Sequence, residues 1–110
     1  MTLSELKTAL EGANEGAFTD KVAYRAFPVG AAPDLPFICI AETETENFTA
    51  DSKVYMKRQF VDIELYSADK DQTSEAAIEA VLDGNEIIWD KSEMYIASEE
   101  MLEVVYEVVI

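Results

Sequence analysis

The order of apolar and polar residues along the chain predicts two helices and six strands. Met1 to Ala13 is expected to form a short amphipathic helix, because Thr2 and Glu5 match a capping box and apolar residues follow at helical spacing. These apolar residues are Leu3, Leu6 and Leu10. The single apolar stripe predicts that this helix packs on a sheet.

The middle of the chain predicts three strands, and the last two of them form a long hairpin. Lys21 to Pro28 alternates as a strand does, and Phe37 to Ala41 is apolar on both faces, which is typical of a buried strand. Acidic residues then continue at every second position: Glu42, Glu44 and Glu46. Asn47 to Asp51 supplies turn chemistry before a return strand at Lys53 to Ser67, so Phe48 is expected near the hairpin tip.

The return strand changes the phase of its alternation. Its apolar residues lie at even positions up to Phe60 and at odd positions from Val61 onward. They are Val54, Met56 and Phe60, followed by Val61, Ile63 and Leu65. A bulge or twist near Arg58 to Val61 is therefore expected, so that the two halves bury opposite faces. The outer half then needs a different partner, either a neighbouring subunit or, if the strand is simply bent, the chain's own first helix.

The rest of the chain completes an α+β pattern. Asp69 to Gly84 predicts a second helix with Thr73 or Ser74 as N-cap. Three strands follow, at Ile87–Trp89, Met94–Ala97 and Leu102–Ile110. The order of helix, three strands, helix, three strands predicts a single α+β domain over residues 1–110. It has a mostly antiparallel sheet, two helices on one face and a long protruding hairpin.

Composition excludes several kinds of chemistry. The chain has no histidine and one cysteine, so histidine acid–base catalysis and Cys/His zinc sites are ruled out. Cys39 lies in an apolar run and is expected to be a buried, inert thiol. No apolar stretch approaches the roughly 18 residues of a membrane span, and the first residues do not match a signal peptide, so we expect a soluble protein made in a cytoplasm.

Two groups of carboxylates are candidate chemical sites. Asp62 and Glu64 share one strand face, as a catalytic acid and base would, but they also match the solvated face of a half-buried strand. Asp69, Asp71 and Glu75 lack the glycine of a calcium loop and are better explained as acidic residues at a helix N-terminus. We therefore expect no enzyme activity, no cofactor and no metal site.

Charge is distributed unevenly. The chain has 23 acidic and 8 basic residues, a net charge of -15. Only Lys70 and Lys91 oppose the acidic residues after position 58, whereas Lys53, Lys57 and Arg58 lie within six positions. A basic arm beside an acidic body favours head-to-tail docking between copies of the chain, although both groups also suit ordinary solvated surface. Such acidity argues against a protein that grips nucleic-acid phosphates, and it suits a surface that nucleic acid slides past.

Several segments between Val22 and Ile110 together match a known family. They are Tyr24, Leu35-Pro36-Phe37, Ala50-Asp51 before Val54-Tyr55, Val61-Asp62-Ile63-Glu64-Leu65-Tyr66, Glu75, and Met101 to Val108 with Tyr106. In these features the chain resembles the tail terminator, or tail completion, proteins of long-tailed phages of Gram-positive hosts, which are similar in architecture to the phage lambda tail terminator.

The resemblance implies a structural role in the virion, at the tail–neck junction. Such proteins form a six-membered ring on the head-proximal end of the tail tube, stop tube growth and present a surface to head completion proteins. Their long hairpin joins neighbouring subunits, and an acidic lumen lets DNA pass without specific binding. The expected subunit-interface residues are Glu42, Glu44, Glu46, Phe48, Lys53, Val54, Tyr55, Met56, Lys57 and Arg58.

Two other functions fit parts of the pattern. A head completion or neck connector protein has a similar size and composition. An acidic DNA mimic that inhibits a host nuclease would also carry high negative charge, but the cluster of Lys53, Lys57 and Arg58 would interrupt a uniformly negative face.

Overall fold

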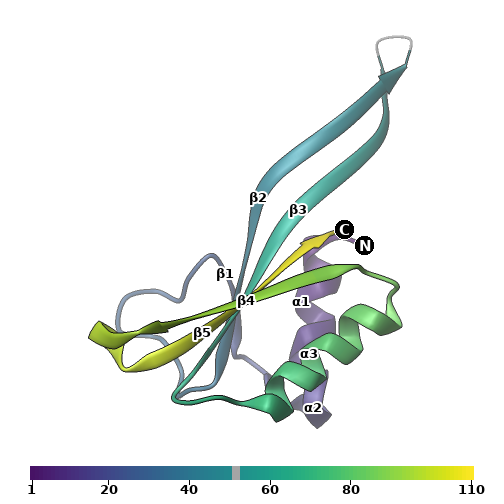
Figure 1. The fold of residues 1–110 in the computed structure, drawn as a ribbon. Helices are drawn as coiled ribbons and strands as arrows, with labels where there is room; N and C mark the ends of the chain where they lie inside the picture. Colours follow the sequence, from purple (N-terminus) through teal and green to yellow (C-terminus); the bar gives the residue numbers. More distant parts are fainter. Residues whose placement is uncertain (51–52) are drawn as a thin grey trace.

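A computed structural model of the protein shows an α+β domain in which three helices lie against one face of a five-stranded mixed sheet (Figure 1). It describes residues 1–50 and 53–110, with side chains for all of these except 48–50 and 53–56. The helices are α1 (Leu3–Glu11), α2 (Ala13–Gly16) and α3 (Gln72–Gly84). The strands are β1 (Val22–Tyr24), β2 (Phe37–Ala50), β3 (Lys53–Ser67), β4 (Trp89–Ile96) and β5 (Met101–Val109), and a 3-10 turn, η1 (Ala97–Glu99), precedes β5.

The sheet order is β1-β2-β3-β5-β4, with β1 and β2 parallel and every other neighbouring pair antiparallel. The α+β class is thereby confirmed, but the predicted element order is wrong in two places. A single turn, α2, adds a third helix within the described residues. The strands predicted at Ile87–Trp89 and Met94–Ala97 are one strand, β4. Because β4 is an edge strand exposed along most of its length, its polar middle needs no apolar alternation.

The helix caps explain where α1 and α3 begin. The capping box of α1 is confirmed: Thr2 Oγ1 accepts a hydrogen bond from the Glu5 amide at 3.1 Å, and Glu5 Oε1 accepts one from the Thr2 amide at 3.0 Å. The predicted N-cap of α3, Thr73 or Ser74, is wrong. Asp71 caps this helix, because its carboxylate accepts from both the amide (3.0 Å) and the hydroxyl (2.7 Å) of Ser74.

We expect Asp71→Ala to lower the free energy of unfolding by about 1 kcal/mol, the usual cost of losing an N-cap side chain. Thr73→Ala, two residues after the cap, should lower the free energy of unfolding by no more than about 0.3 kcal/mol, because alanine is the better helix former. Urea unfolding of both variants checks this. Equal losses in the two variants would contradict the assignment of Asp71 as the cap.

The core lies between the helices and the covered face of the sheet. The largest fully buried side chains come from both layers: Leu6, Leu10, Phe18, Ile38, Ile40, Val61, Ile63, Leu65, Ile78, Leu82, Val104 and Tyr106. These include Leu6 and Leu10 of the stripe predicted for the first helix, and Ile78 and Leu82 of α3, so the prediction that the helices pack on the sheet is confirmed.

The outer parts of β2 and β3 extend well beyond the other strands (Figure 1). Strand β5 pairs with β3 only from Phe60 to Ser67, and β1 pairs with β2 only from Ile38 to Ile40. Residues 44–50 and 53–59, called the arm below, therefore pair only with each other, apart from backbone hydrogen bonds between Gln59 and Ile110. The longest dimension of the molecule is 51 Å, against 28 and 24 Å for the others.

The end of the arm differs from the prediction. The turn expected at Asn47 to Asp51 begins too early, because β2 continues to Ala50. Phe48 pairs in register with Met56. The connection itself, residues 51 and 52, lies outside the described residues.

A bulge lies beside the point where β3 changes phase, but it is in the partner strand, and β3 itself runs without interruption through Phe60 and Val61. The register passes from Glu42 opposite Val61 to Glu44 opposite Phe60, so Thr43 is the extra residue. Its hydroxyl donates to the Phe60 carbonyl at 3.2 Å. Val61 is fully buried in the core, while Phe60 is half-buried on the other face. The expected bulge thus forms at the predicted level of the sheet, opposite Phe60 and Val61 rather than within β3.

Candidate interaction surface

The sheet face away from the helices carries the most unusual group of side chains. Directly paired residues of neighbouring antiparallel strands share a face, so the register defines three rows across β2, β3, β5 and β4. The rows are Ala41, Asp62, Glu107, Asp90; then Cys39, Glu64, Val105, Ser92; then Phe37, Tyr66, Glu103, Met94. We call these twelve residues the open face.

The open face concentrates acidic groups. Five of its twelve residues are Asp or Glu and none is Lys or Arg. In the first row, Glu107 stands directly between Asp62 and Asp90 on neighbouring strands. Like charges in directly opposite positions destabilise a sheet. This arrangement therefore lowers stability, which favours a role in interaction over a role in folding.

Burial and neighbouring negative charge raise the pKa of two of these carboxylates, Asp62 and Glu64. Burial, and then the charge of Glu103, raise the pKa of Asp62. Burial is also the largest cause that raises the pKa of Glu64, and the charges of Glu103 and Asp62 add to it. The Tyr66 hydroxyl, which donates to Glu64 Oε2 at 2.8 Å, opposes that shift without cancelling it.

The two lysines that follow the arm do not reach this face, because both bind α3 on the covered side. Lys70 Nζ lies 3.0 Å from each carboxylate oxygen of Glu75. Lys91 Nζ lies 3.1 Å from Glu75 Oε1 and 2.9 Å from Glu79 Oε2. Glu75 is buried, so these ion pairs compensate a charge inside the domain. Within the described residues, no ion pair neutralises the carboxylates of the open face.

The base of the arm carries charges of both signs, with Lys57 and Arg58 on β3 and Glu44 and Glu46 on β2. Lys57 is exposed. The Arg58 guanidinium lies 5.2 Å from the centre of the Phe60 ring and 3.9 Å from Glu46 Oε1, with both charged side chains more than 40% exposed. An ion pair this long and exposed contributes little stability, so Arg58 is free to exchange partners.

The structure brings together only some of the predicted interface residues. Glu42 accepts hydrogen bonds from Gln59 Nε2 at 3.2 Å and from the Thr45 hydroxyl, so it fixes the base of the arm. Glu44 and Glu46 lie at the base of the arm, where they pair with Phe60 and Arg58 of β3. Five others have side chains outside the described ones: Phe48, Lys53, Val54, Tyr55 and Met56.

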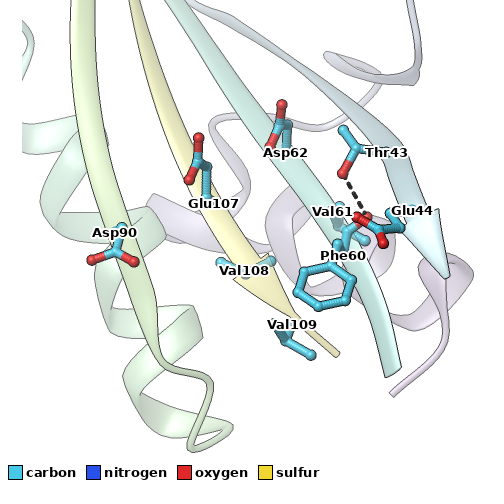
Figure 2. Close-up of a pocket in the computed structure, with 9 residues that line it drawn as sticks. All are labelled: Thr43, Glu44, Phe60, Val61, Asp62, Asp90, Glu107, Val108 and Val109. Carbon is cyan, nitrogen blue, oxygen red and sulfur yellow. Dashed lines mark hydrogen bonds between the residues drawn. The ribbon is translucent and has the colours of Figure 1, made fainter. Parts of the chain in front are cut away.

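A hollow of about 430 Å³ lies where the arm meets the open face. Figure 2 shows its acidic side chains projecting from neighbouring strands around Phe60 and Val109. Its lining is Thr43, Glu44, Phe60, Val61, Asp62, Asp90, Glu107, Val108 and Val109. Sequence reasoning missed Asp90 and Glu107, because only the pairing of β5 with both β3 and β4 places them beside Asp62.

The other chemical groups that the sequence offered have structural partners. Asp71 caps α3, Glu75 binds the two lysines, and Asp69 accepts from the Lys70 amide at 2.8 Å. Cys39 is buried as predicted, and burial raises the pKa of its thiol to about 11. Over residues 1–50 and 53–110, no group of three or more Asp, Glu, His or Cys side chains is arranged to hold a metal ion.

Comparison with known proteins gives no relative. The chain matches no protein-family model and no curated protein sequence. In the described part of the chain, no helix has both the length and the apolar character needed to cross a membrane. The resemblance to tail terminators stays a prediction, and the functional argument rests on the open face and the arm.

We expect the open face to make the free energy of unfolding depend on pH. Because the folded protein raises the pKa values of Asp62 and Glu64, it binds more protons than the unfolded chain above the ordinary carboxyl range. The free energy of unfolding should therefore rise as pH falls from neutral to about 5. At lower pH the trend reverses, since the lowered pKa of Glu79 stabilises the fold only while that group is ionised.

Glu64→Gln should reduce this rise in the free energy of unfolding at lower pH, because the neutral amide replaces one of the groups that takes up a proton. Glu99→Gln removes the same charge outside the open face and should leave the gain unchanged. Thermal unfolding at pH 7 and pH ~5 compares them. A gain of the same size in both variants would contradict the assignment to the open face.

Proposed function

We propose that this chain is a virion structural protein, which caps the head-proximal end of a phage tail tube as a ring. In this role it ends tube polymerisation and offers a surface for joining the head. The observation that carries the proposal is the combination of an acidic open face with an arm that extends past the rest of the sheet and bears Lys57 and Arg58 at its base.

Two different surfaces on one chain favour ring formation. When one patch of a protomer binds a different patch of the next, the contact is heterologous, and it closes into a ring when the rotation between neighbouring copies divides a full turn. The open face is one such patch and is acidic, and the arm is the other, where Lys57 and Arg58 supply positive charge beside Glu44 and Glu46. Charge complementarity of this kind steers encounter and fixes register more than it adds affinity. The proposed number of subunits in the ring, six, comes from the family resemblance.

High negative charge supports passage of DNA through such a ring. A protein binds the phosphate backbone by displacing counterions with clustered Lys and Arg. Here the net charge is -15, and Lys70 and Lys91 are already bound to Glu75. The surface therefore offers DNA little that would hold it.

The place of the protein in the virion tests this role. Met1 is 42% exposed and lies ahead of the capping box of α1, so an affinity tag on a flexible linker at the N-terminus leaves the fold intact. Gold labelling of tagged virions, viewed by electron microscopy, should mark the junction of tail and head. A label at the tail tip, along the tail or absent from the virion would contradict the proposal.

A further inference from the structure

We propose that the free edge of β4 pairs with the same edge of a second copy of this chain, so that two five-stranded sheets join into one. The contact is a twofold dimer of the free protein. It uses an edge of the sheet that the arm does not form, so it goes beyond the proposed ring and does not depend on it.

Strand β4 presents a long and regular edge. It ends the sheet order, and over the described residues no strand pairs with its outer side. Its eight residues pair with β5 without a register shift, and none of them is proline. Proteins usually protect an edge strand with a bulge, a proline, a short length or charged side chains. The edge strand at the other end of the sheet, β1, is protected in this way, because it is three residues long.

The side chains of β4 also favour pairing. Ile88, Met94 and Tyr95 are 88%, 59% and 59% exposed, and they lie in or directly before the strand. The lysine of the strand, Lys91, does not guard the edge, because its ammonium group is bound to Glu75 and Glu79 on α3. A second strand along this edge would cover exposed apolar surface without displacing a free lysine.

The geometry of an antiparallel pair leaves few registers for two identical strands. Outward-facing backbone groups belong to every second residue, so residues pair only when both have odd numbers or both have even numbers. A twofold pair is therefore centred on one residue, and the middle of β4 offers Lys91, Ser92 or Glu93. Centring on Lys91 or on Glu93 would place two like charges directly opposite each other, which destabilises a sheet.

The register centred on Ser92 makes the facing side chains complementary. It places Lys91 opposite Glu93 of the second copy, and the twofold axis forms this pair twice. It also places Trp89 opposite Tyr95, and aromatic cross-strand pairs stabilise a sheet. Lys91 Nζ carries three protons, and its hydrogen bonds to Glu75 and Glu79 use two of them. The third can bind Glu93 of the second copy.

Disulfide formation between single-cysteine variants tests this register. The two copies of residue 92 would lie directly opposite each other, with Cα atoms about 4.5–5.5 Å apart, which a disulfide spans. Ser92→Cys should therefore give a disulfide-linked dimer under mild oxidation. Met94→Cys is the matched control on the same face of β4. Its two copies would lie four residues apart along the strand, about 13 Å, so it should give at least tenfold less dimer.

The natural cysteine does not interfere, because Cys39 is buried, and the unchanged protein should give no linked dimer. Sedimentation velocity of the unchanged protein should show a dimer whose fraction rises with concentration. A monomer at every concentration, together with equal linkage of Ser92→Cys and Met94→Cys, would overturn the proposal.

Charge reversal tests the Lys91–Glu93 pair. Glu93→Lys, added to Ser92→Cys, would place two lysines opposite each other twice and should lower the yield of linked dimer about tenfold. Glu93→Gln removes only the negative charge and should lower the yield by a smaller factor. Asp34→Lys, exposed in the loop before β2, repeats the change in net charge away from β4 and should leave the yield unchanged.

The Glu93 side chain is 49% exposed, so these variants should fold, and circular dichroism verifies this. An unchanged yield with both Glu93 variants, or an equal loss with Asp34→Lys, would overturn the Ser92-centred pairing. Each of these outcomes concerns the β4 contact alone. The position of the protein in the virion, which gold labelling measures, tests the terminator role separately.

Discussion

Tyr106→Ala should lower the free energy of unfolding by about 3–5 kcal/mol, a large share of the about 5–15 kcal/mol that is typical of a native domain. Tyr106 is fully buried in the middle of β5, and the Trp89 ring packs against it edge-on with the ring centres 5.5 Å apart. Alanine would leave a cavity between the sheet and α3. It would also remove the hydrogen bond that the Tyr106 hydroxyl donates to Glu79 Oε2 at 2.7 Å.

Tyr106→Phe separates these two effects, because it keeps the ring and removes only the hydroxyl. Its cost should be about 1–2 kcal/mol, since Glu79 keeps its contact with Lys91 at 2.9 Å. Urea denaturation of both variants measures the losses. If the alanine variant loses no more than the phenylalanine variant, Tyr106 does not join α3 to the sheet as described.

Lys57→Glu combined with Arg58→Glu should abolish complementation of a phage that lacks this gene. The reversed arm would meet an acidic surface on the next copy with like charge, and such contacts are opposed by several kcal/mol. Folding should be unaffected, because Lys57 is exposed and the Arg58–Glu46 pair is long and exposed. Plaque formation with the variant supplied from a plasmid measures the effect, and circular dichroism checks the fold.

The matched control is Lys21→Glu combined with Arg25→Glu. It produces the same change in net charge next to β1 and away from the arm, and it should complement normally. Normal plaques with the reversed arm would contradict an electrostatic contact made by the arm. Loss of plaques with both double variants would show sensitivity to total charge alone.

Local patterns in the sequence were enough to predict the elements that have a clear period or cap. The capping box at Thr2 and the apolar stripe of α1 are where they were expected. The change of phase at Phe60 and Val61 also marked a real irregularity, although the extra residue is Thr43 in the facing strand. The apolar pattern of β3 shows that its two halves bury opposite faces. It does not show which of two paired strands carries an inserted residue.

The errors come from places where tertiary position outweighs local pattern. The sequence predicts two strands where β4 is one, because the middle of β4 is polar, yet an edge strand tolerates polar residues on both faces. The hollow was missed for a related reason. Asp62, Glu107 and Asp90 are far apart in the sequence, and they become neighbours only through the order β3-β5-β4.

Tail length in the absence of this protein tests the central proposal most directly. Lysates of a phage carrying this gene, with the gene intact or deleted, are compared by negative-stain electron microscopy, and tail length and head attachment are scored. The terminator role predicts headless tails of uncontrolled, excessive length in the deletion. Tails of normal length without heads would contradict it in favour of a neck connector, and intact virions would contradict any role in tail assembly and favour the DNA-mimic alternative.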